Sequence, residues 1–129
     1  MRQYLYISTA VQVPAEDLAA ILGSCERNNP AAGVTGLLLY NGRNFLQLLE
    51  GEQDELERIM RRVEHDSRHQ GISRLYDEGI EARACDAWWM KRIALGEPGE
   101  ARHERLDGEL PQALDPHVRR LILNFAMLN

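Results

Sequence analysis

Three polar groups stand in apolar surroundings that do not favour them. Gln47 lies in the run Phe45-Leu46-Gln47-Leu48-Leu49, and Tyr6 lies in a second apolar segment near the start of the chain. A buried amide without a partner costs about 1–3 kcal/mol, so Gln47 is expected to meet a polar group inside the protein. The third group is the step Asn28-Asn29-Pro30. Together the three groups predict a bound heteroaromatic ligand.

Side-chain alternation indicates how the first two groups meet. Tyr6 shares a strand face with Tyr4, and Gln47 shares one with Phe45 and Leu49. If both faces look toward a layer of helices, the phenol and the carboxamide can approach each other. A plainer interpretation stays open, in which Tyr6 is a core tyrosine and Gln47 bonds to backbone.

The asparagines also allow two interpretations. Asn tolerates a left-handed backbone and is common at helix C-termini, so one of Asn28 and Asn29 is accounted for as a cap. The other carboxamide offers both a donor and an acceptor, which suits the imide edge of a ligand.

A second helix is predicted over residues 53–66, and it places Arg62 and Asp66 on one face. Most such pairs are solvated, but this pair flanks an apolar stripe and could reach over the edge of a cleft between helices. Trp88-Trp89-Met90 is typical of strand packing, with one tryptophan on each side of the sheet. His65, His69 and His103 form no convincing metal site.

These residues are positioned by a predicted β-α-β-β-α-β-β order. Strands are expected over residues 3–9, 33–40, 44–50, 71–81 and 87–95. A first helix begins at Pro14 and ends at Asn28-Asn29-Pro30, because the residue before a proline avoids the α region. Asn41-Gly42 predicts a hairpin closed by a type I′ turn.

The last part of the chain differs in composition. A charged stretch follows Gly96-Glu97-Pro98-Gly99, and Asp115-Pro116 then forms the N-cap and first residue of a helix. Its apolar stripe is expected to pack on the exposed sheet face or on a partner, and its breadth indicates self-association. We therefore divide the chain into residues 1–97 and a helical extension over residues 98–129.

Composition narrows the class of protein. The chain has 129 residues and a net charge of -5, which suit one globular domain. No block of Lys and Arg is present, which disfavours nucleic-acid binding, and no apolar stretch reaches membrane-spanning length. Cys25 and Cys85 are expected as small buried hydrophobic residues. With no secretion signal, phosphate-binding glycine loop, nucleophile elbow or metal motif, the sequence favours a cytoplasmic binding module over an enzyme.

Together these residues resemble the BLUF family of flavin-binding blue-light sensors. The resemblance covers roughly residues 3–95, and the order of its motifs is more specific than any single motif. The motifs are Tyr6, Asn28-Asn29-Pro30-Ala31-Ala32-Gly33-Val34-Thr35-Gly36, Phe45-Leu46-Gln47-Leu48-Leu49-Glu50-Gly51, Arg62, Asp66-Ser67-Arg68-His69 and Trp88-Trp89-Met90.

The resemblance implies a ferredoxin-like α+β fold with a mixed five-stranded sheet and two helices on one face. A flavin, usually FAD, would lie noncovalently between the helices. Tyr6 would be the electron and proton donor to the excited flavin, and Gln47 the hydrogen-bond switch at the flavin N5/O4 edge, which would produce a small absorption red shift.

The remaining roles follow from the same resemblance. Asn29 would bond the O4/N3 edge with Asn28 as its neighbour. Arg62 would lie near O2, and Asp66 on the ribityl side. Trp88 and Met90 would respond to the switch and relay it to a separate downstream signalling protein, since no output domain is expected within these 129 residues.

Two other classes of function stay open at this level. One is a ferredoxin-like regulatory module that binds a small molecule independently of light, and the other is a small acylphosphatase-like enzyme. The enzyme would need a phosphate-cradling loop after the first strand, where the sequence reads Ser8-Thr9-Ala10-Val11-Gln12-Val13.

Overall fold

The structure is a computed structural model that describes residues 1–10, 30–66, 69–86, 88–93, 95 and 100–127. The helix predicted from Pro14 falls outside these residues. The described elements are β1 (Arg2–Ala10), β2 (Thr35–Tyr40), β3 (Asn44–Gly51), α2 (Gln53–Glu64), β4 (His69–Gly79), β5 (Trp89–Ile93), α3 (Glu100–Glu109) and α4 (Pro116–Ala126).

The strands form one mixed five-stranded sheet in the order β4-β1-β3-β2-β5. β1 pairs antiparallel with both β3 and β4, β2 pairs antiparallel with β3, and β2 pairs parallel with β5. This sheet confirms the predicted α+β, ferredoxin-like class. β1 and β3 each pair with a strand on both sides, and all residues of β3 after Asn44 are buried.

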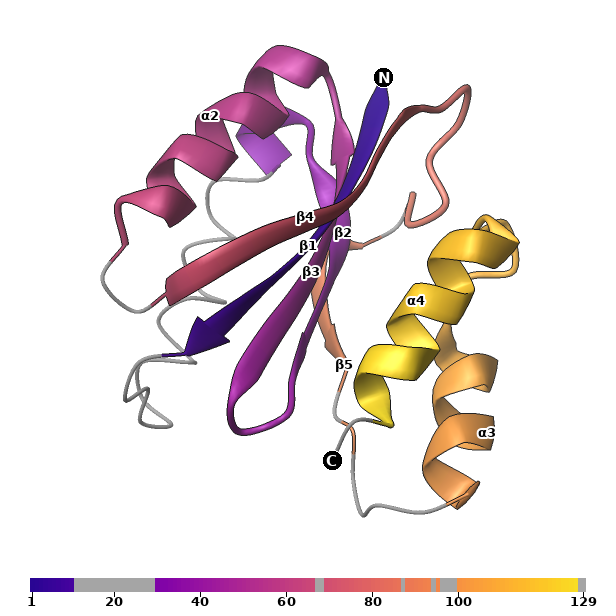
Figure 1. Ribbon diagram of the computed structural model, residues 1–129. Helices are drawn as coiled ribbons and strands as arrows, with labels where there is room; N and C mark the ends of the chain where they lie inside the picture. Colours follow the sequence, from indigo (N-terminus) through magenta and orange to yellow (C-terminus); the bar gives the residue numbers. More distant parts are fainter. Residues whose placement is uncertain (11–29, 67–68, 87, 94, 96–99, 128–129) are drawn as a thin grey trace.

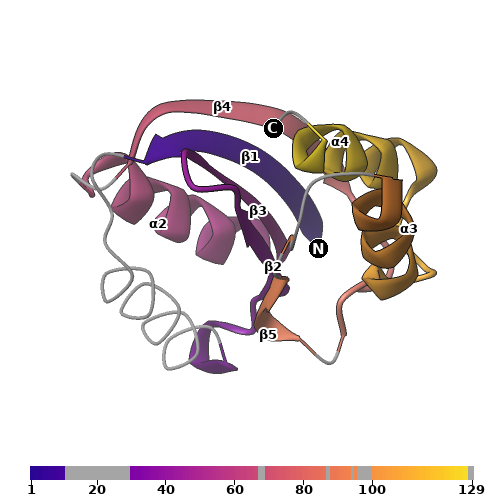
Figure 2. The ribbon, with the colours of Figure 1, turned by 90° about the horizontal axis from the view of Figure 1, so that it is seen from below.

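Helices cover both faces of the sheet. α2 packs on one face, while α3 and α4 pack on the other (Figures 1 and 2). On the α2 side, Leu56, Ile59 and Met60 bury the apolar stripe of the helix against Tyr4, Tyr6 and other strand residues. The opposite core joins leucines of β1, β2 and β3 to Leu106, Val118 and Ile122.

In the C-terminal part, the structure confirms the predicted N-cap of the last helix, and it adds a helix, α3, that the sequence did not predict. Asp115 caps α4, because its carboxylate accepts a hydrogen bond of 2.8 Å from the backbone N–H of His117. α3 was not predicted, since its charged residues obscure a sparse apolar spacing. Leu106 and Leu110 lie four residues apart, and both are buried in the core beneath α3 and α4.

The hairpin between β2 and β3 differs in detail from the prediction. The predicted type I′ turn needs positive φ at both Asn41 and Gly42, but of these two residues only Gly42 has it, at +89°. The Asn41 carboxamide oxygen instead accepts hydrogen bonds from the N–H groups of Arg43 and Asn44, at 3.0 and 2.7 Å. The turn is therefore centred one residue later, with Asn41 as an Asx cap.

Helical structure is also present just after the predicted end of the first helix. Residues 30–32 are helical, although the sequence predicted an end at the step before them. Gly33 ends this turn with a φ of +69°, and its N–H bonds to the Pro30 carbonyl at 3.2 Å.

Candidate functional site

The centre of the site is a hydrogen-bonded pair on neighbouring strands. The register of β1 and β3 places Tyr6 directly opposite Gln47. Both side chains are buried on the α2 side of the sheet, at 0% and 5% exposure. The Tyr6 hydroxyl donates to Oε1 of Gln47. The predicted approach of phenol and carboxamide is confirmed, and Gln47 bonds to side chains instead of to backbone.

The other end of the Gln47 carboxamide meets a thioether. Its Nε2 donates to Sδ of Met90 at 3.3 Å. A thioether is a weak acceptor, so it holds the amide nitrogen in place without strong competition. Tyr6, Gln47 and Met90 therefore form a continuous polar chain across three strands of an otherwise apolar layer.

Met90 reaches this position through a β-bulge. Gly36 pairs with Trp89 and Leu37 pairs with Lys91, so Met90 is the extra residue between them. Its φ is +137°, which non-glycine residues rarely adopt. The bulge turns a 3% exposed side chain toward Gln47, where a Cβ on Gly36 would lie 3.3 Å from Met90 Cε. Backbone strain of this kind is kept only where surrounding contacts enforce it.

Trp88 lies on the other side of the sheet from this polar chain. It precedes β5 and packs against the core beneath α3 and α4. The Lys91 ammonium lies 4.4 Å from the centroid of a Trp88 ring. Regular alternation would put Trp88 and Met90 on one face, and the bulge separates them.

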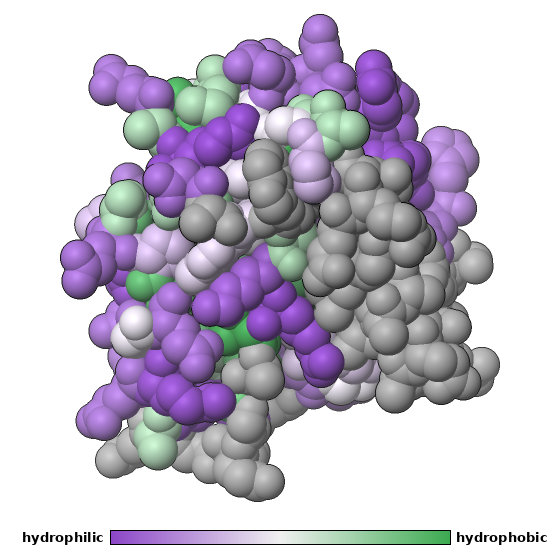
Figure 3. All heavy atoms as spheres, turned by 180° about the vertical axis from the view of Figure 1, so that it is seen from behind, coloured by the Kyte–Doolittle hydropathy of each residue, from purple (hydrophilic) through white to green (hydrophobic). Residues whose placement is uncertain are grey.

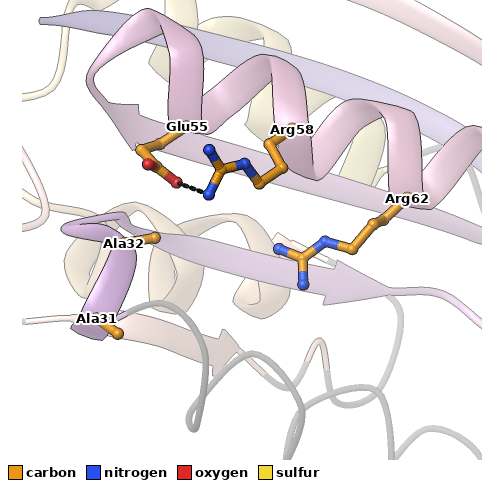
Figure 4. A pocket seen from close by; sticks show the side chains of 5 residues that line it. All are labelled: Ala31, Ala32, Glu55, Arg58 and Arg62. Atoms are coloured by element: carbon orange, nitrogen blue, oxygen red, sulfur yellow. Dashed lines mark ion pairs between the residues drawn. The ribbon is translucent and has the colours of Figure 1, made fainter.

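A pocket opens beside α2, with a volume of about 220 Å³. Its lining residues are Ala31, Ala32, Glu55, Arg58 and Arg62 (Figure 4). Arg58 forms an ion pair of 3.4 Å with Glu55, so its charge is partly neutralised. Arg62 reaches from the same helix into the space beside Ala31 and Ala32, where its positive charge could hold an anionic or carbonyl group of a ligand.

The remaining predicted site residues are the pair Arg62 and Asp66 and the two asparagines. The shared helix face of Arg62 and Asp66 is wrong, because α2 ends at Glu64 and Asp66 follows its C-cap, His65. Asp66 is half-buried, and its N–H bonds to the Val63 carbonyl at 3.1 Å. Asn28 and Asn29 lie outside the described residues.

A second tyrosine on the same strand face belongs to a separate network. The Tyr4 hydroxyl donates to Oε1 of Glu57 at 2.6 Å, and Arg74 pairs with the same oxygen at 3.1 Å. Burial and this hydrogen bond raise the pKa of Tyr4 to about 12. The Tyr4 hydroxyl lowers the pKa of Glu57 below its ordinary value. This network ties α2 to β1 and β4 and leaves Tyr6 as the tyrosine that contacts Gln47.

The described part of the chain carries no other kind of site of the classes considered above. No group of three His, Cys, Asp or Glu side chains could hold a metal ion there. No described helix has the length and apolar character needed to cross a membrane. Cys85 is a free, buried cysteine, as the sequence predicted.

The fold and the site define an α+β domain of ferredoxin-like topology. A chain of hydrogen-bonded side chains lies buried between its sheet and a helix. The family model described as BLUF, sensors of blue light using FAD, matches residues 1–91. The chain belongs to the BLUF family. It is therefore a flavin-using sensor module for blue light, which confirms the expectation of a sensor in place of an enzyme.

Curated relatives are longer proteins. The chain is 34% identical over 93 residues to photoactivated adenylate cyclase subunit beta of Euglena longa, covering 71% of this chain and 11% of the relative. It is 36% identical over 94 residues to the blue light- and temperature-regulated antirepressor BluF of Escherichia coli, covering 73% and 22%. The chain thus spans less than a quarter of either relative.

Solved structures extend the likeness to nearly the whole chain. The dark-state structure of BlrB, a BLUF protein, superimposes with a TM-score of 0.75 at 30% identity, covering 96% of both chains. Klebsiella pneumoniae BlrP1, solved with FMN and cyclic diGMP, gives a TM-score of 0.84 at 25% identity, covering 97% of this chain and 34% of BlrP1.

Proposed function

We propose that this chain is a blue-light photoreceptor in which Tyr6 and Gln47 form the light-driven switch of a noncovalently bound flavin. The observation that supports it best is the buried chain from the Tyr6 hydroxyl through the Gln47 carboxamide to the Met90 sulfur. These three hydrogen-bonded side chains place polar groups at the centre of an apolar layer. Among them, only the Gln47 carboxamide can exchange its donor and acceptor ends.

The residues present suit a flavin. The Gln47 amide nitrogen has two N–H groups, and among the described residues only Met90 accepts from it. The other N–H is therefore available to an acceptor on the edge of a ligand ring. We assign cofactor binding to Tyr6, Gln47, Arg62 and Asp66, together with Asn28 and Asn29. FAD is the flavin we propose, following the description of the family.

The chemistry divides between cofactor and protein. A bound flavin supplies blue-light absorption and, once excited, oxidising power. Tyr6 would give an electron and its hydroxyl proton to the excited flavin, which would remove the donor that orients the Gln47 oxygen. Gln47 then rotates or tautomerises, so that its donor and acceptor ends exchange roles. After the electron and proton return to Tyr6, the rearranged carboxamide would remain and would present a donor to the ring edge of a bound flavin, which would account for a red shift.

The change leaves the site through the strand that carries Met90. Loss of the Gln47–Met90 bond releases a side chain whose backbone is already strained, and such a local event can bias a bistable element elsewhere. We assign Met90 and Trp88 to this relay, residues 1–97 to flavin binding and residues 98–129 to a helical extension.

The proposed output is a separate signalling protein, contacted in the cytoplasm by a homo-oligomer of this chain. Relatives supply the precedent, since one is named an antirepressor and others are named light-activated cyclases. Among the described residues, the face seen in Figure 3 is mainly hydrophilic, with small, separate hydrophobic patches.

A visible spectrum of the purified chain tests the proposal. The protein, expressed with ample flavin, should be yellow and should show a small, reversible red shift after blue light. A folded but colourless protein would instead support a light-independent small-molecule-binding module. Heat release of the flavin followed by chromatography distinguishes FAD from FMN.

A further inference from the structure

Glu50 is a fully buried carboxylate on the face of β3 opposite to Gln47. Its exposure is 0%, and three residues along a strand put the two side chains on opposite faces. A buried charge is tolerated only where hydrogen bonds replace its water. Its partners therefore indicate what holds it in place.

Four donors surround this carboxylate. Gln3 Nε2 donates to Oε2 at 2.8 Å, and the Thr35 hydroxyl lies 3.2 Å from Oε1. Gln3 and Thr35 are the direct neighbours of Glu50 on β1 and β2. The backbone N–H groups of Ala84 and Cys85 each donate to one oxygen at 2.8 Å.

The last two donors belong to the segment that leads to Met90. β4 and β5 are opposite edges of the sheet, so the residues between them must cross it, and they do so on the side of α4 (Figure 1). Arg83 adds bonds of 2.9 Å to the Glu50 carbonyl and 3.0 Å to the Thr35 hydroxyl. Glu50 therefore fixes this crossing at the centre of the sheet.

Further backbone bonds link the crossing to the bulge. The Trp88 N–H bonds to the Cys85 carbonyl at 3.0 Å, and the Gly36 N–H bonds to the Trp88 carbonyl at 2.9 Å. Only Trp89 then separates this anchored turn from Met90. At the other end, Cys85 is 2% exposed in the core that contains α3 and α4.

We propose that Glu50 is a positioning residue for the light response. Its carboxylate holds the segment from Arg83 to Met90 so that the Met90 sulfur faces Gln47, and so that displacement of Met90 reaches the core beneath α3 and α4 through Cys85. This inference rests on the proposed function of Gln47, but its first consequence concerns the dark protein alone.

E50Q tests the inference, because the amide keeps the size of the side chain and points N–H groups at neighbouring donors. Hydrogen exchange in the dark should show protection of the Ala84 and Cys85 amides falling by about tenfold or more, the change that the loss of a buried hydrogen bond produces. The variant should still bind flavin. Its dark recovery should slow, and the light-induced change in exchange of α3 and α4 should be lost.

Two control variants distinguish a positioning role of Glu50 from an effect of its buried charge or of general destabilisation. Glu78→Gln makes the same chemical change at an exposed position of β4 and should match the wild type. Gln3→Met removes one donor from the Glu50 carboxylate without touching Ala84 or Cys85, so it should keep their protection. If Gln3→Met behaves like E50Q, burial of the charge is what matters and the inference is overturned.

The remaining outcomes also decide the question. Wild-type protection at Ala84 and Cys85 in E50Q, or a light response of α3 and α4 that survives there unchanged, would overturn the inference. So would a red-shifting wild type whose α3 and α4 show no light response. A wild type without a red shift contradicts the proposed function instead, while the dark exchange still tests the anchor. If E50Q does not fold, Glu50→Asp, which keeps the charge but draws the carboxylate back from Ala84 and Cys85, should show the same loss of protection, and wild-type protection there would refute the anchor.

Discussion

Gln47 and Met90 are joined by a 3.3 Å contact between a carboxamide nitrogen and a thioether sulfur, across the strand β2 that lies between them. Two irregular features produce it, a polar side chain at the centre of an apolar strand and a bulge with a φ of +137° at Met90. The contact links the residue proposed to switch with the residue proposed to move.

Replacing Gln47 by leucine should abolish the red shift while flavin binding persists. Leucine keeps most of the volume and removes the only group between Tyr6 and Met90 that can exchange donor and acceptor ends. Absorption spectra before and after blue light measure the effect, and Gln112→Leu, at an exposed position between α3 and α4, is the control. A normal red shift in Gln47→Leu would refute the assigned switch.

Replacing Tyr6 by phenylalanine should abolish the photocycle. Phenylalanine cannot supply the hydroxyl proton, and the Gln47 oxygen loses its donor, at a cost of about 1–3 kcal/mol. Tyr4→Phe is a matched control on the same strand face, because Tyr4 is equally buried but bonds to Glu57. Flash spectroscopy should show the red-shifted state in Tyr4→Phe and not in Tyr6→Phe. A photocycle retained in Tyr6→Phe would remove this residue from the donor role.

Replacing Met90 by leucine should keep the red shift and slow its decay in the dark. The substitution removes the sulfur that accepts from Gln47, which weakens the resting arrangement relative to the rearranged one. A loss of about 0.5 kcal/mol, the lower limit for a hydrogen bond, corresponds to roughly a twofold slower recovery. Recovery followed by absorbance measures this. An unchanged rate would show that the sulfur contact does not stabilise the resting state.

Replacing Arg62 by alanine should weaken flavin binding. Arg62 is exposed and lines the pocket beside α2, so its charge is partly screened and worth up to about 1 kcal/mol. The expected loss of affinity is about fivefold, measured by the quenching of flavin fluorescence during titration. Arg61→Ala changes the exposed neighbour and serves as the control. Equal affinities of the two variants would exclude Arg62 from the binding site.

The Tyr4–Glu57 hydrogen bond should make the free energy of unfolding depend on pH in the acid range. Tyr4 lowers the pKa of Glu57 below its ordinary 4.5, so the folded state holds the carboxylate charged where the unfolded state protonates it. The stabilisation is therefore full above about pH 4.5 and is lost as pH falls through the lowered pKa. Tyr4→Phe should lose less stability than the wild type between pH 7 and about pH 3, as measured by urea unfolding. Parallel losses would show that this bond does not control the acid response.

Much of the site could be predicted from local patterns. Alternation placed Tyr6 and Gln47 on inward faces, and Asp115-Pro116 identified the start of α4, because both depend on residues close in sequence. The type I′ turn failed because the Asn41 side chain caps the loop in place of adopting a positive φ. Arg62 and Asp66 were wrongly joined because helix ends are set by tertiary contacts as much as by propensity.

Glu50 shows what the sequence pattern obscured. A glutamate at the end of an apolar strand resembles a solvent-facing terminus, and only its neighbours on β1 and β2 and the crossing segment make it interior. α3 was obscured similarly, since a few leucines among charged residues become a buried stripe only when a sheet face lies beneath them.

The sequence by itself determined the family, the presence of the phenol and carboxamide, and the faces on which they lie. The tertiary structure alone decided that Tyr6 stands opposite Gln47 and that Met90, not Trp88, completes the polar chain. It also decided that the Glu50 carboxylate bonds to the segment that leads to Met90. The reason is physical. Periodicity is a local property of the chain, whereas strand register and bulges depend on pairing between distant residues, and a shift of one residue turns every side chain to the other face.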